Sequence, residues 1–279
     1  MIPYMGGDTR LADYILSLLP RADTLLEAFG GGGSVSLKAA DLGLFKHIIW
    51  NDLDFYTYSA FYVIKHHPEV IQTIHEVLNF VADCLEKGDR ETVKDFVKDI
   101  VKDLERGKVS DVVEAGFYTL VIHSICSNTL GYRIRWPSTP QRYRTYALRL
   151  YRYNRLLTRI EIMNRDAFEV IPEFDRPSVV MYLDPPHIIE WRGQVGYYRL
   201  SFRPSDAARL DKLLSELKYA KVLLKLSPQD LKYYRNVCTT FHKVEKKYRK
   251  HASDSRATGT YYFFMNYEVK KTPTLLEYL

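Results

Sequence analysis

The sequence predicts an α/β fold, in which helices cover both faces of a Rossmann-like sheet and a helical insert interrupts the alternation of strands and helices. Three observations support this prediction. Short apolar runs end at four consecutive glycines (Gly30 to Gly33), at Asp52 and at Asp184. Segments with helical periodicity separate those runs. The stretch from Phe55 to Arg106 has helical periodicity alone and gives no strand signal.

The overall composition is that of an ordinary globular protein. The 279 residues can bury a full core, and the net charge is +6 with a pI near 9.0. Three cysteines form neither a zinc pattern nor a disulfide framework, which suits a reducing compartment. The first residues do not resemble a signal peptide, and no apolar run is long enough to cross a bilayer. We therefore expect a cytoplasmic protein without a membrane partner.

The first expected unit is a helix over residues 9–19, a strand over 24–28, a helix opening at Ser34 and a strand over 47–50. Glycines between the first strand and the second helix allow the backbone to approach a ligand closely. Asp52 follows the second strand, about 20 residues after the glycines, where nucleotide-binding units hold a ribose. Neither a dinucleotide fingerprint nor a phosphate loop is present. This unit therefore predicts an adenosine-type ligand without a pyrophosphate.

The middle of the chain is predicted to be mainly helical. After the helical stretch up to Arg106, residues 111–130 predict a further, mostly buried helix. The prolines Pro137 and Pro140 favour an extended loop over residues 131–145, which a basic helix over 146–159 follows.

The α/β pattern then resumes to the end of the chain. Ser205 is the expected N-cap of one of its helices. The expected elements are a strand at 160–163, a helical turn at 166–171, a strand ending at 184, a helix at 205–217, a strand at 221–226, a helix at 228–234, and strands at 241–247 and 260–268 around a polar loop.

Asp184-Pro185-Pro186-His187 is the most informative stretch of the chain. Two prolines end a strand, because each lacks a backbone donor and has a fixed φ. The strand therefore delivers the Asp184 carboxylate to the carboxyl edge of the sheet, where α/β folds bind ligands. An ordinary Asp-Pro turn is the alternative interpretation.

A basic and aromatic cluster lies between Ala115 and Ile160, a stretch without any Asp or Glu. Arginines bind phosphates and guanine edges, and aromatic rings stack on bases. The cluster therefore indicates nucleic-acid binding, with a solvated basic surface as the alternative. The loop from Arg249 to Gly259 is a second candidate, with an ordinary hairpin as its alternative. The arginines of the cluster are Arg133, Arg135, Arg142, Arg144, Arg149, Arg152, Arg155 and Arg159.

Taken together, these motifs resemble those of the Dam-type adenine-specific DNA methyltransferases, which use S-adenosylmethionine. The motifs occur in the order of that family and span nearly the whole chain. The matching segments are Pro3–Gly7, Glu27–Ser34, Asp52, Asn164–Phe168, Asp184–His187 and Tyr197–Asp206.

The resemblance implies a Rossmann-like methyltransferase sheet formed by residues 1–56 and 160–279, with a helical target-recognition insert over 57–159. It also implies double-stranded DNA as partner and no metal, and it leaves monomer and homodimer open. Its cofactor-binding residues would be Tyr4, Gly6, Gly7, Arg10, Glu27, Phe29, Gly30, Gly31, Gly33, Ser34, Asp52, Asp166, Ala167 and Asp184. Its catalytic residues would be Asp184, Pro185, Pro186 and His187, and its DNA-binding residues Arg133, Arg135, Arg142, Arg144 and Arg149.

Two positions depart from the family pattern. Asp8 stands where the family has a cofactor-binding lysine, and Arg10 is our hypothesis for its replacement. His187 stands where the family has a tyrosine; an imidazole still stacks on a base and can also titrate near neutral pH.

The implied chemistry is methylation of the adenine amine. Asp184 and the Pro185 carbonyl would each accept one hydrogen from that amine, whose lone pair then leaves conjugation and attacks the methyl group. The base must be flipped out of the duplex, and His187 would stack on it without taking a proton. Methylation of RNA or of a cytosine amine, and a non-catalytic nucleic-acid-binding protein on the same scaffold, are the alternatives.

Overall fold

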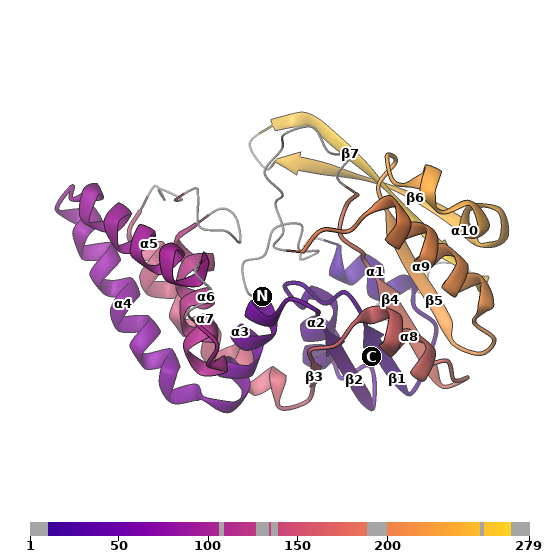
Figure 1. The fold of residues 1–279 in the computed structure, drawn as a ribbon, viewed down its shortest axis with the longest axis horizontal. Coiled ribbons are helices and arrows are strands. Elements are labelled where there is room, and N and C mark those ends of the chain that lie inside the picture. Colours follow the sequence, from indigo (N-terminus) through magenta and orange to yellow (C-terminus); the bar gives the residue numbers. More distant parts are fainter. Residues whose placement is uncertain are drawn as a thin grey trace.

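The computed structural model of the protein describes residues 11–105, 109–126, 134, 139–188, 200–251 and 254–268. The described part contains a seven-stranded sheet of order β3-β2-β1-β4-β5-β7-β6. Figure 1 shows the sheet on one side of a group of helices. The first five strands are parallel, and β7 is antiparallel to both β5 and β6. The strands are β1 (Thr24–Glu27), β2 (His47–Asn51), β3 (Glu161–Met163), β4 (Val179–Leu183), β5 (Lys221–Leu226), β6 (His242–His251) and β7 (Asp254–Met265).

The order of the strands reverses at β1, which pairs with both β2 and β4. Glu27, the last residue of β1, lies opposite Trp50 of β2 and Tyr182 of β4. The chain segments that follow these three strands therefore leave the sheet side by side. Such a switch point is where open α/β sheets form a ligand crevice.

Apolar side chains alternate between the two faces of the sheet, so each face is covered. One face carries Leu25 and Trp50 and packs against α1 (Ala12–Leu18) and α2 (Ser34–Leu42). The other carries Leu26 and Met181 and packs against α8 (Ala167–Glu173), α9 (Pro204–Glu216) and α10 (Arg235–Thr240). The predicted α/β class with helices on both faces is confirmed.

The helices α3 to α7 form a group beside the sheet. Figure 1 shows that α4 and α5 lie farthest from the sheet. Gly116 marks a close approach of α6 to α3, because a Cβ there would lie 2.3 Å from the Ser59 carbonyl oxygen. The apolar core continues from Trp50 of the sheet through Phe61 to Leu120 of this group. The helices are α3 (Phe55–His66), α4 (Pro68–Glu86), α5 (Arg90–Glu105), α6 (Val112–Ile125) and α7 (Gln141–Leu157). None of the helices in the described ranges is long and apolar enough to cross a bilayer.

Several predicted element boundaries were wrong. The helix expected from residue 146 begins at Gln141, because Pro140 already has helical backbone angles and a proline is compatible with a helix start. The last two strands extend to His251 and from Asp254, because long-range pairing continues where the local sequence is polar.

Two helix starts in the last third were also misplaced. Arg203, rather than Ser205, is the N-cap of α9, where its backbone N–H donates to the Asp206 carboxylate at 2.8 Å. The helix expected over 228–234 is a short 3-10 turn (Leu231–Tyr233) before α10, which begins at Arg235. The carboxylate of Asp211 caps this later start.

Candidate active site

A cavity of about 320 Å³ opens at the carboxyl edge of β1, β2 and β4. This volume is in the range of small-molecule sites. The cavity lies at the switch point of the sheet, so chain segments far apart in sequence meet there. Its walls are the loop after β1, residues 52–54, 166–168, 184–187 and 200–202, two side chains of α9, and Lys225 of β5.

The glycine loop after β1 forms one wall of the cavity. A Cβ on Gly30 would lie 2.1 Å from the Trp50 indole nitrogen, and one on Gly33 would lie 2.7 Å from Phe61. Gly33 also has a φ of +63° and turns the chain into α2. Gly30 and Gly31 line the cavity together with Phe29 and Ser34, whereas Gly33 does not line it.

Glu27 connects the end of β1 to the first turn of α2. Its buried carboxylate accepts the backbone N–H of Ser36 at 2.9 Å. An acid at a helix N-terminus also interacts favourably with the helix dipole. Glu27 lines the cavity and at the same time fixes the glycine loop that follows it.

Asp52, which follows β2, also binds the glycine loop. Its two oxygens accept the backbone N–H groups of Gly31 at 2.7 Å and Asp54 at 2.9 Å. Each carboxylate oxygen has a further lone pair for a ligand hydroxyl. Burial raises the pKa of Asp52 to about 6, although both hydrogen bonds act in the opposite direction. The charged form, which a diol would prefer, therefore predominates only above pH 6.

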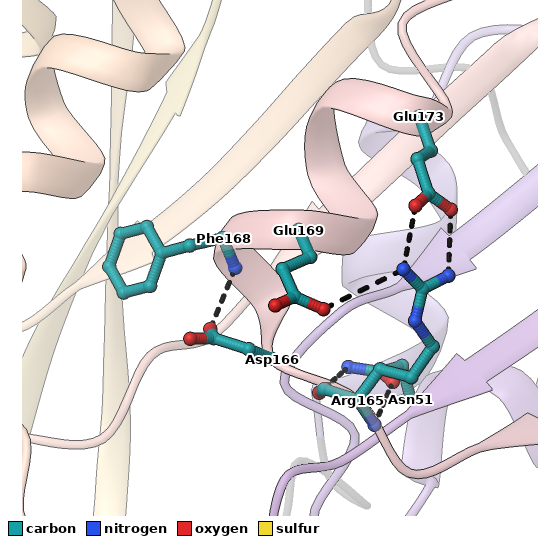
Figure 2. Close-up of polar contacts among 6 residues, drawn as sticks. All are labelled: Asn51, Arg165, Asp166, Phe168, Glu169 and Glu173. Atoms are coloured by element: carbon teal, nitrogen blue, oxygen red, sulfur yellow. Dashed lines mark hydrogen bonds and ion pairs between the residues drawn. The ribbon is translucent and has the colours of Figure 1, made fainter.

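Asn51 is a buried connector that sequence reasoning missed. Its amide nitrogen donates to the carbonyls of Ala28 and Arg165, both at 3.0 Å, and its oxygen accepts the N–H of Arg165 at 3.0 Å. Figure 2 shows this side chain against the Arg165 backbone. Asn51 thereby joins the end of β1 to the loop that carries Asp166. An amide directly before the predicted ribose acid was its only signal in the sequence.

Asp166 caps α8 at the rim of the cavity. One carboxylate oxygen accepts the N–H of Phe168 at 2.9 Å (Figure 2). The other oxygen gives the carboxylate capacity for a ligand donor. The Phe168 ring packs 4.1 Å from the Arg209 guanidinium of α9. Asp166, Ala167 and Phe168 all line the cavity, as the sequence predicted for the first two.

Arg165, by contrast, points to the outside of α8. Its guanidinium forms a two-pronged ion pair with Glu173, at 2.7 and 2.6 Å, and a weaker one with Glu169 (Figure 2). These contacts hold the loop before α8, which positions Asp166.

Asp184 follows β4 directly, with Pro185 and Pro186 behind it, and all three line the cavity. Lys225 of β5 donates to an Asp184 carboxylate oxygen at 2.7 Å. The Lys225 side chain is only 2% exposed, and its ammonium lies 4.3 Å from the centre of the Tyr261 ring. The sequence does not predict this partner, although it places a lysine inside the apolar run of β5.

His187 also lines the cavity, and it has a buried acidic partner. Its Nδ1 lies 3.1 Å from an Asp230 carboxylate oxygen, which also accepts the Ser227 hydroxyl at 2.6 Å. The hydrogen bond to Asp230 raises the pKa of His187 against the opposing effect of burial. Ser227 and Asp230 lie in the loop after β5, and no motif in the sequence predicted either of them.

The predicted DNA-binding arginines of α7 have different surroundings. Arg144 pairs with two acids of α4, Asp83 and Glu86, the latter at 2.6 Å. Arg142 and Arg149 are exposed. The other predicted positions Tyr4, Gly6, Gly7, Asp8, Arg10, Arg133 and Arg135 lie outside the described residues.

Comparison with known families finds a match that covers most of the chain. The model of a family described as D12 class N6 adenine-specific DNA methyltransferase matches residues 4–252. The matched range contains every wall of the cavity. A search of curated proteins gives no match.

Proposed function

Because the chain belongs to the D12 class N6 adenine-specific DNA methyltransferase family, we propose that its cavity binds S-adenosylmethionine and methylates N6 of a flipped adenine. Family membership gives the reaction, which is methylation of adenine in DNA. The assignment of cofactor and residues rests chiefly on one observation. Asp52, at the end of β2, and Asp184-Pro185-Pro186-His187, at the end of β4, line the same cavity.

The residues of the cavity fit an adenosine-type methyl donor. Asp52 has lone pairs for a ribose diol, and Asp166 has one for an exocyclic amine. The glycine loop leaves room for close approach of a ligand to its backbone. When bound, S-adenosylmethionine supplies an electrophilic methyl group on a sulfonium.

The chain's own part in the reaction is to activate and orient the target amine. The Asp184 carboxylate accepts a hydrogen bond from one N–H of the amine, and the Pro185 carbonyl accepts one from the other N–H. These two hydrogen bonds make the nitrogen lone pair available for attack. Lys225 holds one Asp184 oxygen at 2.7 Å and so fixes the plane of the carboxylate. His187, which follows Pro186, lines the same cavity and packs on the flipped base.

We assign the helical segment 57–159 to recognition of the DNA target, and residues 1–56 and 160–279 to catalysis. The exposed arginines Arg142 and Arg149 of α7 support this division. The core is shared between the two parts, so we expect them to fold as one unit.

Transfer of labelled methyl from S-adenosylmethionine to mixed-sequence duplex DNA tests the proposal. Nucleoside analysis of the product should show N6-methyladenine. Asp184→Asn should be inactive, whereas Asp175→Asn, a control at a carboxylate that only caps the loop before β5, should be active. Label on cytosine or on RNA alone would contradict the proposal.

A further inference from the structure

The His187 imidazole lies between the cavity and a buried acid. Asp230 is 4% exposed and accepts two hydrogen bonds on one oxygen, from Ser227 at 2.6 Å and from His187 Nδ1 at 3.1 Å. Its other oxygen lies 3.4 Å from the backbone nitrogen of Ile188. Asp230 therefore contacts both the His187 ring and the backbone that follows it.

The geometry determines which edge of the ring faces the ligand. His187 lines the cavity, whereas Ser227 and Asp230 do not. Nδ1 points to Asp230, so the opposite edge of the ring, with Nε2, faces the cavity. Burial raises the pKa of Asp230, but the hydrogen bonds from His187 and Ser227 outweigh burial and hold that pKa below its usual value. The oxygens of an ionised Asp230 can only accept hydrogen bonds. The neutral imidazole therefore carries its proton on Nδ1, which donates a hydrogen bond to Asp230.

We propose that Asp230, supported by Ser227, is a positioning residue that anchors the His187 ring for the flipped adenine and makes methylation depend on the charge of that ring. The anchor removes rotation about the bond that joins ring and Cβ, so the ring presents the same face to each incoming base. This inference rests on the proposed function for its substrate, but the Asp230–His187 contact itself does not.

The charge of the ring matters because the target nitrogen becomes cationic during the reaction. A neutral imidazole leaves the Asp184 carboxylate free to stabilise that charge, whereas an imidazolium beside it opposes the charge. Within the described ranges, Asp184 and Lys225 of β5 are the other charged groups that act on the ring. Asp206 and Arg209 of α9 line the same cavity as His187, and Tyr234 lies near Asp230 and Asp184. The rate of methylation should therefore rise with pH as His187 loses its proton.

Nuclear magnetic resonance of the imidazole nitrogens in the full chain, without ligand, tests the contact directly. His187→Tyr identifies the His187 signals among those of the eight histidines. The neutral ring should carry its proton on Nδ1, and Asp230→Asn should lower the pKa of His187. Asp211→Asn is the matched control, because Asp211 is equally buried but caps α10 instead. A His187 pKa that Asp230→Asn leaves unchanged would overturn the proposal.

Kinetics with duplex DNA separate anchoring from charge. Asp230→Asn removes the charge beside the ring, so the fall of kcat at acidic pH should move to lower pH. The variant keeps an acceptor oxygen for Nδ1, so KM for DNA should change little. Asp230→Ala also loses the anchor, and its KM should rise about 2- to 10-fold, as expected for one side chain that must be ordered on binding. His187→Tyr should lack this fall of kcat. A fall of kcat at the same acidic pH in wild type and Asp230→Asn, or an unchanged KM in Asp230→Ala, would refute the proposal.

A chain that methylates no DNA contradicts the proposed function, while the resonance measurement still decides whether Asp230 controls His187. If the chain methylates DNA but kcat falls at the same acidic pH in wild type and in Asp230→Asn, the proposed function stands and Asp230 has no positioning role.

Discussion

The Asp184–Lys225 pair decides how the central carboxylate can be tested. Lys225 is 2% exposed, so Asp184→Ala would remove the carboxylate that pairs with a buried ammonium. Loss of one partner from a buried pair costs about 3–5 kcal/mol, and we expect Asp184→Ala to lose roughly 3 kcal/mol of unfolding free energy. The double variant Asp184→Ala/Lys225→Met should regain most of that loss. Urea denaturation of both proteins measures it, and equal stabilities would show that the pair is not coupled.

Asp52 should make cofactor affinity depend on pH. Its folded pKa of about 6 lies above the ordinary value, so Asp52 is half protonated near pH 6 and mostly neutral at pH 5. A diol binds the charged form, and affinity for S-adenosylmethionine should drop about 10-fold from pH 7 to pH 5. Asp52→Asn should bind weakly and without this dependence. Calorimetry at the two pH values measures the effect, and equal wild-type affinities would exclude Asp52 as the titrating contact.

At this scale the sequence predicted the residues that follow apolar strands, namely Asp52, Asp166 and Asp184. It missed their partners. Lys225 lies 41 residues from Asp184, and Asp230 lies 43 residues from His187, so only strand pairing brings them together. Lys225 did leave a signal, because a charged residue in a buried strand requires a partner.

Among the elements, the glycine loop leaves little room for substitution at Gly33. Gly33 and Gly43 both have left-handed backbone, but a Cβ on Gly43 meets only the Arg159 guanidinium at 3.5 Å. Gly43→Ala should therefore cost only the conformational strain, about 1–2 kcal/mol. Gly33→Ala adds a clash with Phe61 at 2.7 Å and should cost more. Thermal unfolding compares the two, and equal losses would show that Phe61 yields freely.

Element types were more predictable than element ends. The apolar run of β4 ends at Asp184-Pro185, so its boundary could be read locally. The β6–β7 ladder runs from His242 opposite Met265 to His251 opposite Asp254. Its outer part is polar and charged, and such residues indicate a loop until the partner strand is known.

The molecule as a whole brings a helical group beside the ligand edge of a sheet, and the DNA prediction belongs to this scale. If exposed Arg142 and Arg149 contact phosphates, replacing either with glutamine should flatten the salt dependence of DNA binding by about one unit. Arg144→Gln is the control, because Arg144 already pairs with Asp83 and Glu86. Fluorescence anisotropy between about 50 and 200 mM salt measures the slopes. Equal slopes in all four proteins would place the DNA elsewhere.

The fold class followed from the order of apolar runs, but the continuous core did not. Phe61 of α3 stacks on Trp50 of β2 with ring centres 4.0 Å apart, and this contact joins the helical group to the sheet. Helical periodicity shows that one face of α3 is buried without showing what covers it. Strand order and helix placement depend on such nonlocal contacts.

The most direct test of the account compares cofactor binding and methylation in three proteins. S-adenosylmethionine binding is measured by calorimetry at pH 7.5 and N6-methyladenine by nucleoside analysis, in wild type, Asp52→Ala and Asp184→Asn. If Asp52 binds the cofactor and Asp184 activates the target amine, Asp52→Ala should lose most of its cofactor affinity. Asp184→Asn should keep that affinity and lose methylation. Undiminished cofactor binding by Asp52→Ala, or N6-methyladenine formed at the wild-type rate by Asp184→Asn, would contradict the account.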